Sequence, residues 1–431
     1  MNTVTNRKRS VLTLIITLIT SVLTFANTPN AKKATAITQV YGDGVRMIAV
    51  ALEYPKEVSG SDFTTTDFTV EGRTITGIFA SHSVSLTDKA DKGKFLIVQL
   101  SPDDTDISLA YKMKMSNATT STTPKKGGKK WVAGDKLSEN LAYKDAHATI
   151  KQKSGTAITT TAVKNLVVDD FQQLTFKDPQ TNKTLRYNLF VPKNQGKDPL
   201  PLVLFMHDAG VTSEYHRATL FQGLGAVVWA SPEEQAKRPC IVLAPQFDEI
   251  IVDDNAQTSP MMETTIHLIE NLSKQYNIDQ NRIYTTGQSG GCMMSIAMNI
   301  KYPDLFAAAY LVAGQWNPDL VAPIAKKKLW IMVSVDDLGA FPGENAITKR
   351  LEKEGAKISR AWWNATWNTN EYRFAYDKIV AENNPIKYTV FEKGTVFLPG
   401  ADTAGASGHR NTWRVAYSIE PIREWLFEQR K

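Results

Sequence analysis

The chain has 431 residues, of which 42% are hydrophobic and 22% are charged, so it can build a sizeable core and is long enough for two domains. Its formal charge is +6, and three of these charges are Arg7, Lys8 and Arg9, which leaves about +3 for the remainder. So small an excess argues against nucleic acid or a membrane surface as a partner.

The first 26 residues have the pattern of a secretory signal peptide. The basic residues 7–9 precede an apolar run, Val11–Phe25, which ends in the small-residue cleavage pattern Thr24-Phe25-Ala26. An uncleaved anchor is the alternative, but the run is short and rich in threonine for a bilayer core of ~30 Å. We therefore expect a signal peptide at 1–26, no stable membrane insertion after its cleavage, and a secreted, extracellular or periplasmic protein.

Residues 36–163 show short strands separated by turns. Val45–Glu53, Arg73–Ala80 and Lys94–Leu100 are predicted strands, and Tyr111–Met115 alternates between apolar and cationic residues as a half-exposed strand does. The pattern predicts an all-β, immunoglobulin-like sandwich. A basic low-complexity stretch within it, Ser116–Lys130, is predicted to be a solvated loop. The role of the sandwich stays open between polymer binding, contact with the second domain and homo-oligomer formation.

Residues 169–431 alternate between strands and helices. The predicted strands are Lys183–Val191, Leu202–Met206, Cys240–Ala244, Arg282–Thr286, Ala307–Val312 and Leu329–Val333. Helices are predicted at Met261–Tyr276 and Trp413–Glu428. This alternation is typical of α/β domains with a mainly parallel sheet covered by helices on both faces, in which the site forms at the carboxyl edge of the strands.

The stretch Gly287-Gln288-Ser289-Gly290-Gly291 is a G-x-S-x-G pattern between a predicted strand and a helix-forming run. Strand, tight turn and helix are what a nucleophile elbow requires, and its glycines allow close backbone packing. An ordinary glycine-rich turn is the alternative. The pattern predicts Ser289 as a catalytic nucleophile.

A nucleophilic serine needs a base, and the base needs an acid that holds its tautomer. In folds with this elbow the chain order is serine, acid, histidine. Of the six histidines (82, 147, 207, 216, 267 and 409), only His409 follows Ser289, so the order selects His409 as the base, in a loop before the terminal helix. Asp336 and Asp337 follow the strand Leu329–Val333, and position alone does not decide between them.

The oxyanion of the reaction needs backbone N–H donors. Gly290 supplies one by its place after the nucleophile. The other is expected from the loop His207-Asp208-Ala209-Gly210, where Asp208 and Ala209 are both candidates and His207 is interpreted as an organiser of the loop.

The remaining motifs are less specific. Trp362, Trp363 and Trp367, with Tyr372, Phe374 and Tyr376, form either an aromatic wall of the substrate pocket or core packing. Pocket walls are expected from the long loops Phe247–Pro260, Gln315–Pro323 and Ala340–Glu382. Cys240 and Cys292 are predicted to be buried and unpaired. The sequence holds no metal-ligand or phosphate-loop motif, so no cofactor and no metal are predicted.

These motifs resemble the α/β-hydrolase fold. The likeness is to secreted esterases of the polyhydroxybutyrate depolymerase and feruloyl-esterase-like group, including those with an N-terminal immunoglobulin-like domain. It rests on Leu204–Gly210, Gly287–Gly291, Val333–Asp337 with Pro342-Gly343, and His409 with Trp413–Tyr417. The resemblance implies Asp337 as the acid. The sequence departs from the group at Asp208 and Ala209, where glycines are usual, and at Val333-Ser334, where many relatives have His-Gly.

The leading hypothesis is a secreted serine esterase that hydrolyses small-molecule or polymeric carboxylic esters through Ser289, His409 and Asp337 and an acyl-enzyme. A serine peptidase of the prolyl-oligopeptidase type is the first alternative, although the N-terminal region is too small for a propeller. A binding or adhesion protein with an inactive hydrolase domain is the second.

Overall fold

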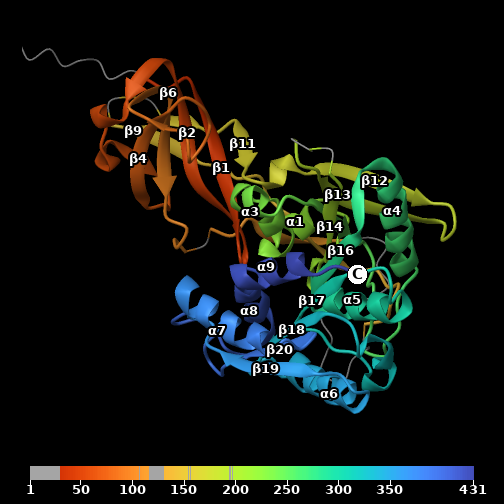
Figure 1. Cartoon of the computed structure of the whole chain (residues 1–431). Coiled ribbons are helices and arrows are strands. Elements are labelled where there is room, and N and C mark those ends of the chain that lie inside the picture. Colours follow the sequence, from red (N-terminus) through yellow and green to blue (C-terminus); the bar gives the residue numbers. More distant parts are fainter. Residues whose placement is uncertain are drawn as a thin grey trace, which may run out of the picture.

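The computed structural model describes residues 30–431 except positions 106, 116–130, 154, 156, 194, 195 and 197. The predicted signal peptide at 1–26 and the low-complexity segment Ser116–Lys130 lie outside the described residues. In the described part of the chain, no helix is long and apolar enough to cross a membrane. Figure 1 shows a smaller β body next to a larger body of strands and helices.

The smaller body is a β-sandwich. Six strands form one sheet in the order β11-β1-β2-β6-β4-β5, and three form another in the order β10-β9-β3. Their bounds are β1 Lys33–Tyr41, β2 Gly44–Ser59, β3 Phe68–Val70, β4 Ile75–Ser81, β5 Lys89–Ala90, β6 Lys92–Leu100, β9 Thr149–Gln152, β10 Ala157–Thr159 and β11 Ala162–Asn165. Buried Leu52 and Val98 from the first sheet share one core with Phe68 and Ile150 from the second. The predicted immunoglobulin-like fold class is confirmed.

The larger body is built on a mixed sheet with the strand order β12-β13-β15-β14-β16-β17-β18-β20-β19. The bounds are β12 Gln172–Asp178, β13 Lys183–Phe190, β14 Leu200–Met206, β15 Ile241–Gln246, β16 Ile278–Gln288, β17 Ala308–Val312, β18 Leu329–Ser334, β19 Ile358–Trp363 and β20 Ile386–Phe391. β13 pairs antiparallel with β12 and β15, and the pairs from β15 to β19 are parallel. Almost every residue of the central strands is buried, as expected for a sheet covered on both faces.

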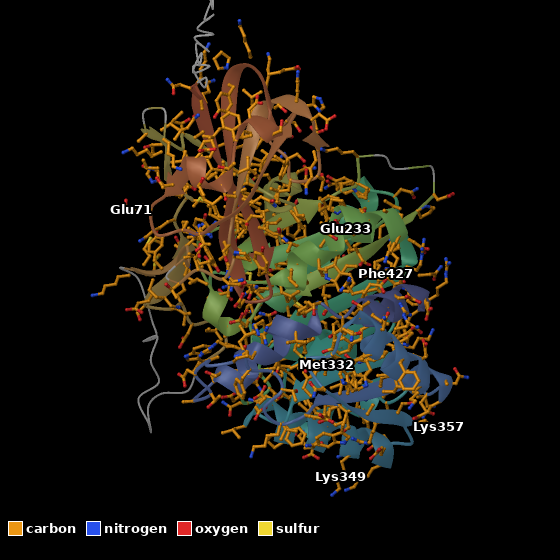
Figure 2. All side chains as sticks on the ribbon, turned by 90° about the vertical axis from the view of Figure 1, so that its left-hand side faces the viewer. Glu71, Glu233, Met332, Lys349, Lys357 and Phe427 are labelled. Carbon is orange, nitrogen blue, oxygen red and sulfur yellow. The ribbon has the colours of Figure 1, made fainter. Side chains whose placement is uncertain are left out.

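Helices flank the sheet. Their bounds are α1 Ala218–Phe221, α2 Leu224–Val227, α3 Pro232–Lys237, α4 Met261–Gln275, α5 Gly290–Lys301, α6 Ala340–Lys353, α7 Thr369–Ala381, α8 Ser407–Ala416 and α9 Glu420–Glu428. In Figure 1, α4, α5 and α6 lie on one side of the sheet and α7, α8 and α9 on the other. Figure 2 shows Met332 inside this body and Lys349 and Lys357 pointing outward. The predicted α/β class is confirmed.

Three sequence predictions about elements are wrong. The stretch 340–382, expected as a long loop, holds α6, β19 and α7. The single terminal helix expected at Trp413–Glu428 is two helices, α8 and α9, because Pro421 lies in the first turn of α9. Proline has no N–H and clashes with a preceding helical turn, so it begins a helix rather than continuing one. α8 begins at Ser407, so His409 lies in its first turn and not in a loop.

The two bodies are in direct contact. The turn between β1 and β2 packs against α8, since a Cβ on Gly42 would lie 2.1 Å from the carbonyl oxygen of Arg414. A separate strand pair, β7 (Ala110–Lys114) and β8 (Glu139–Tyr143), carries Tyr143 against Phe221 of α1, with 5.2 Å between ring centroids. The smaller body is therefore packed onto the elements that surround the candidate site.

Candidate active site

Ser289 lies at the turn between β16 and α5, with φ 52° and ψ −118°. This positive-φ conformation is costly for a residue with a side chain and is found at functional turns. A Cβ on Gly291 would lie 1.9 Å from the carbonyl oxygen of Met206, and one on Gly287 would lie 2.4 Å from the carbonyl carbon of Gly291. Both glycines are therefore needed to let β16, β14 and α5 approach so closely.

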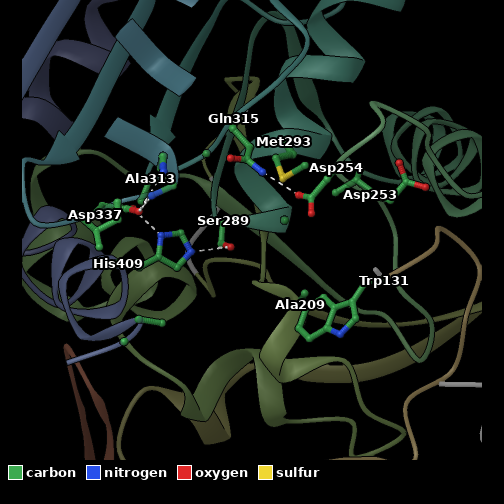
Figure 3. Close-up of a pocket in the computed structure, with 18 residues that line it drawn as sticks. Trp131, Ala209, Asp253, Asp254, Ser289, Met293, Ala313, Gln315, Asp337 and His409 are labelled. Carbon is green, nitrogen blue, oxygen red and sulfur yellow. Dashed lines mark hydrogen bonds and ion pairs between the residues drawn. The ribbon is translucent and has the colours of Figure 1, made fainter. Parts of the chain in front are cut away.

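His409 joins Ser289 to Asp337. Its Nε2 is 2.8 Å from Ser289 Oγ, and its Nδ1 is 2.5 Å from Asp337 Oδ2 (Figure 3). Asp337 is only 3% exposed, and its second oxygen accepts hydrogen bonds from the amides of Gly339 and Ala340 at 3.1 and 2.9 Å. The structure brings the three predicted residues, Ser289, His409 and Asp337, into one chain of hydrogen bonds, which we call the relay.

Asp336 points elsewhere. Its Oδ2 accepts a hydrogen bond from the Gly394 amide at 2.7 Å and one from the Ser334 hydroxyl at 3.3 Å. These contacts connect the loop after β18 to the loop after β20, so the Asp336 side chain holds the two loops together and does not contact His409. A Cβ on Gly408 would lie 2.1 Å from the Asp336 carbonyl oxygen, so glycine before His409 allows α8 to reach this loop.

The loop after β14 is shaped by Asp208 and His207. The Asp208 carboxylate accepts hydrogen bonds from the Gly210 amide at 2.8 Å and the Gln288 side chain at 3.1 Å. The Phe247 amide donates to His207 Nε2 at 3.0 Å, so Nδ1 holds the proton and donates to the Asp208 carbonyl at 2.8 Å. Burial lowers the pKa of His207, which keeps it neutral in this role. His207 thus organises the loop, as its place in the sequence indicated.

Ala209 brings its backbone next to Gly290. It begins the short turn Ala209–Val211, and Gly290 begins α5, so neither amide has a partner within its own turn. A Cβ on Gly290 would lie 3.4 Å from the Ala209 nitrogen. The two amides therefore border one small space next to Ser289.

The relay opens into a pocket of about 490 Å³. Figure 3 shows His409 and Asp337 on one side of Ser289, with Gln315, Met293 and Asp254 on another. The Gln315 amide donates to Asp254 at 2.7 Å across this region. Among the described residues that line the pocket, the charged groups are the carboxylates of Asp253, Asp254 and Asp337, apart from His409 when it is protonated.

A buried carboxyl group lies behind the relay. Glu344 is 1% exposed and accepts a hydrogen bond from the Gly314 amide at 2.9 Å. Burial raises the pKa of Glu344 well above its usual range, which favours the neutral acid.

Within the described residues, no group of three or more His, Cys, Asp or Glu side chains is placed to hold a metal ion. Cys240 and Cys292 are both buried and free, as predicted. Burial raises the pKa of each thiol, so neither is a thiolate nucleophile at neutral pH.

Comparison with known proteins adds family information. Residues 33–164 match the family described as the esterase Ig-like N-terminal domain, and residues 249–344 match the prolyl oligopeptidase family. The solved structure titled "Crystal Structure of a Thermostable Esterase" is similar to 93% of this chain and 100% of its own, with 26% identity and a TM-score of 0.73.

Two relatives match over shorter stretches. Acetylxylan esterase A of Emericella nidulans is 28% identical over 143 residues, which cover 32% of this chain and 44% of the relative. Poly(3-hydroxyalkanoate) depolymerase C of Paucimonas lemoignei is 40% identical over 47 residues, 11% of each chain. The alignment thus spans less than half of the acetylxylan esterase.

The chain has an α/β-hydrolase fold with an esterase Ig-like N-terminal domain, and it is similar to esterases. The match over residues 33–164 and the likeness along nearly the whole chain to one esterase decide this. The resemblance noted in the sequence is thereby confirmed for the fold and the group.

In this hydrolase several residues line the pocket although no sequence motif predicts them there. Trp131 lines the pocket although it belongs to the N-terminal half, and it follows a lysine-rich stretch that resembles a solvated loop. Leu338, Gly405 and Ala406 also line it. Only their nearness along the chain to Asp337 and His409 could have indicated them.

The sequence left two roles open for the aromatic cluster, a wall of the substrate pocket or core packing, and the cluster does not form the pocket wall. Trp362, Trp363, Trp367 and Phe374 line a separate hollow between β19 and α7 and are absent from the described lining of the Ser289 pocket. Trp363 is 1% exposed and packs on Trp330, with ring centroids 5.8 Å apart, so core packing is the correct interpretation for it.

Proposed function

We propose that this α/β-hydrolase cleaves carboxylic esters, with Ser289 as nucleophile, His409 as general base and acid, and Asp337 as the group that orients His409. The observation that carries the proposal is the relay at the pocket, with 2.8 Å from Ser289 Oγ to His409 Nε2 and 2.5 Å from His409 Nδ1 to Asp337. These distances match those of an activated nucleophile and its oriented base.

The reaction has two halves. Ser289 Oγ attacks the carbonyl carbon while His409 takes its proton, and the tetrahedral intermediate collapses as His409 returns that proton to the leaving alcohol. Water then attacks the acyl-enzyme with His409 as base, and the carboxylic acid leaves as Ser289 is regenerated. The Asp337 carboxylate stabilises the positive charge that His409 holds in each half.

The amides of Gly290 and Ala209 hold the oxyanion in this proposal. Of the two loop candidates, Ala209 is favoured over Asp208 because its nitrogen lies 3.4 Å from the position of a Cβ on Gly290. The Asp208 side chain supports this geometry by accepting from Gly210. Preorganised backbone donors of this kind stabilise the charge that develops on the carbonyl oxygen.

A serine peptidase is the second candidate, and a specific observation favours it. Residues 249–344, which include Ser289 and Asp337, match the prolyl oligopeptidase family. The same relay would attack a peptide carbonyl, so the relay alone does not separate the two reactions. The full-length likeness to an esterase favours ester cleavage.

One set of assays tests the proposal. Hydrolysis of nitrophenyl esters and of peptide anilides is measured for the wild type and for Ser289→Ala. We expect ester turnover in the wild type, a loss of about 10³-fold or more in Ser289→Ala, and anilide turnover far below ester turnover. Faster anilide cleavage would favour the peptidase. Equal ester turnover in both proteins would refute both reactions and leave an inactive binding protein.

We propose further that residues 1–26 are a signal peptide, that 36–163 and 169–431 act as separate domains, and that the protein is exported. The relatives support an extracellular esterase only in general terms. Mass spectrometry of the exported protein should find an N-terminus at Asn27. A retained N-terminal segment would contradict the cleavage site.

A further inference from the structure

The segment 131–137 of the N-terminal half is bound to the loop after β15. The Gly134 amide donates to the Ile250 carbonyl at 2.7 Å, and the Ile250 amide donates to the Asp135 carbonyl at 2.8 Å. Ala133 donates to the Asp253 carboxylate at 3.4 Å, and Lys136 forms an ion pair with Asp248 at 3.0 Å. This backbone pairing gives the segment a defined position beside the catalytic pocket.

The segment is also fixed at its C-terminal end. Leu137 is 3% exposed, and the Ser213 hydroxyl donates to the Leu141 carbonyl of β8 at 2.6 Å. Tyr143 at the end of β8 belongs to the same hydrophobic core as the hydrolase sheet. A residue presented by this segment is therefore held by the hydrolase half, not only by the sandwich.

Trp131 is the residue that the segment presents to the pocket. Its half-buried indole lines the cavity together with Val252 and Met293. Figure 3 shows Trp131 on the far side of Ser289 from His409 and Asp337. Val252 lies close to the nucleophile turn, since its Cγ2 is 3.8 Å from the position of a Cβ on Gly290.

The chemistry of ester cleavage determines which side of this pocket holds the alcohol and which holds the acyl group. His409 must protonate the leaving oxygen, so the alcohol lies on the His409 side, where Leu338, Gly405 and Ala406 line the cavity. The carbonyl oxygen turns toward Gly290 and Ala209. The remaining direction from the tetrahedral carbon leads away from His409, toward Trp131, Val252 and Met293, which we call the acyl side.

We propose that Trp131 closes the acyl side and sets the length of acyl chain that the enzyme accepts. This inference rests on the proposed esterase function. The acyl side combines apolar contacts from Trp131, Val252 and Met293 with the carboxylates of Asp253 and Asp254, and the described lining has no lysine or arginine. It therefore suits short, uncharged acyl groups and disfavours acyl groups that carry a carboxylate.

The test compares acyl-chain selectivity in matched variants of the full-length protein. We measure kcat/KM for nitrophenyl acetate, butyrate and octanoate in the wild type, Trp131→Ala, Trp131→Leu and Trp362→Ala. Trp362 is the control because it is an exposed tryptophan that lines the separate hollow at β19. Thermal unfolding of each variant checks that the fold is kept.

Removing the indole should lengthen the acyl side. We expect the octanoate-to-acetate ratio of kcat/KM to rise about tenfold or more in Trp131→Ala, because each methylene in an apolar pocket is worth about tenfold or more in specificity. Trp131→Leu should shift the ratio in the same direction by less, and it serves as the test if the alanine variant does not fold. Trp362→Ala should leave the ratio unchanged.

One result would overturn the inference while the proposed function stands. It is an unchanged octanoate-to-acetate ratio in a folded Trp131 variant, whether kcat/KM stays the same or falls equally for all three esters, as it would for a purely structural role. A wild type without Ser289-dependent turnover of any ester would instead refute the proposed function, and this inference with it.

Discussion

The hydrogen bonds of Asp337 make Asp337→Asn a sharp test of the relay. One carboxylate oxygen accepts from the amides of Gly339 and Ala340, at 3.1 and 2.9 Å, and the other faces His409 Nδ1 at 2.5 Å. In the asparagine variant the side-chain oxygen must stay against the two amide donors. The NH₂ group is then forced toward His409 Nδ1, which must offer a lone pair.

This reverses the tautomer of the base. With Nδ1 unprotonated, His409 carries its proton on Nε2, which points at Ser289 Oγ and cannot take the serine proton. Triads with the wrong tautomer lose about 10⁴-fold in kcat, or about 5.5 kcal/mol of transition-state stabilisation. Steady-state hydrolysis of nitrophenyl acetate measures this loss, and thermal unfolding should show a folded protein.

Asp336→Asn is the matched control. The Asp336 side chain accepts from Gly394 and Ser334, and an asparagine oxygen keeps one acceptor there. Its kcat should stay within about threefold of the wild type, because a surface loop contact contributes little to the transition state. If Asp336→Asn lost several orders of magnitude and Asp337→Asn did not, the assignment of the acid would be wrong.

Two further predictions concern the oxyanion space and the pH dependence of stability. Gly290→Ala should keep the fold but lower kcat about 10²-fold, because its methyl group would lie 3.4 Å from the Ala209 nitrogen and fill the space meant for the oxyanion; unchanged kcat in the assay would exclude this pair of amides. Burial opposes ionisation of Asp178, but hydrogen bonds led by that from His267, at 2.7 Å, lower its pKa to about 2. A lowered carboxyl pKa contributes stability that is present above the unfolded pKa of 3.8 and is lost as the pH falls toward 2. Asp178→Asn should therefore lower the free energy of unfolding by about 2 kcal/mol at pH 7 and by little near pH 2. Urea unfolding at several pH values checks this, and an equal loss at every pH would show that ionisation of Asp178 is not the cause.

The nucleophile turn could be predicted from the sequence because its requirements are local. A strand, two glycines at fixed places and a helix suffice, and the structure explains each glycine by a backbone atom within 2.4 Å of its missing Cβ. The histidine followed from chain order alone. The choice of Asp337 over Asp336 needed the family resemblance, because the two side chains point to opposite partners only in the folded loop.

The rest of the pocket depends on contacts between distant segments. Trp131 reaches the site through backbone pairing with Ile250, and no local pattern announces such a pairing. Trp362 and Trp363 are neighbours in β19, yet one is 57% exposed and the other 1%, because successive strand residues face opposite sides. Which side meets a pocket depends on the place of β19 in the sheet order, which the sequence does not contain.

The central claim is that Ser289 is the nucleophile of an esterase, and labelling with a fluorophosphonate tests it most directly. The wild type should gain one adduct, mapped by mass spectrometry to the peptide that contains Ser289, and should lose ester turnover in proportion to labelling. Ser289→Ala should gain no adduct at this peptide. Labelling at another residue, or full ester turnover after Ser289 is labelled, would contradict the account.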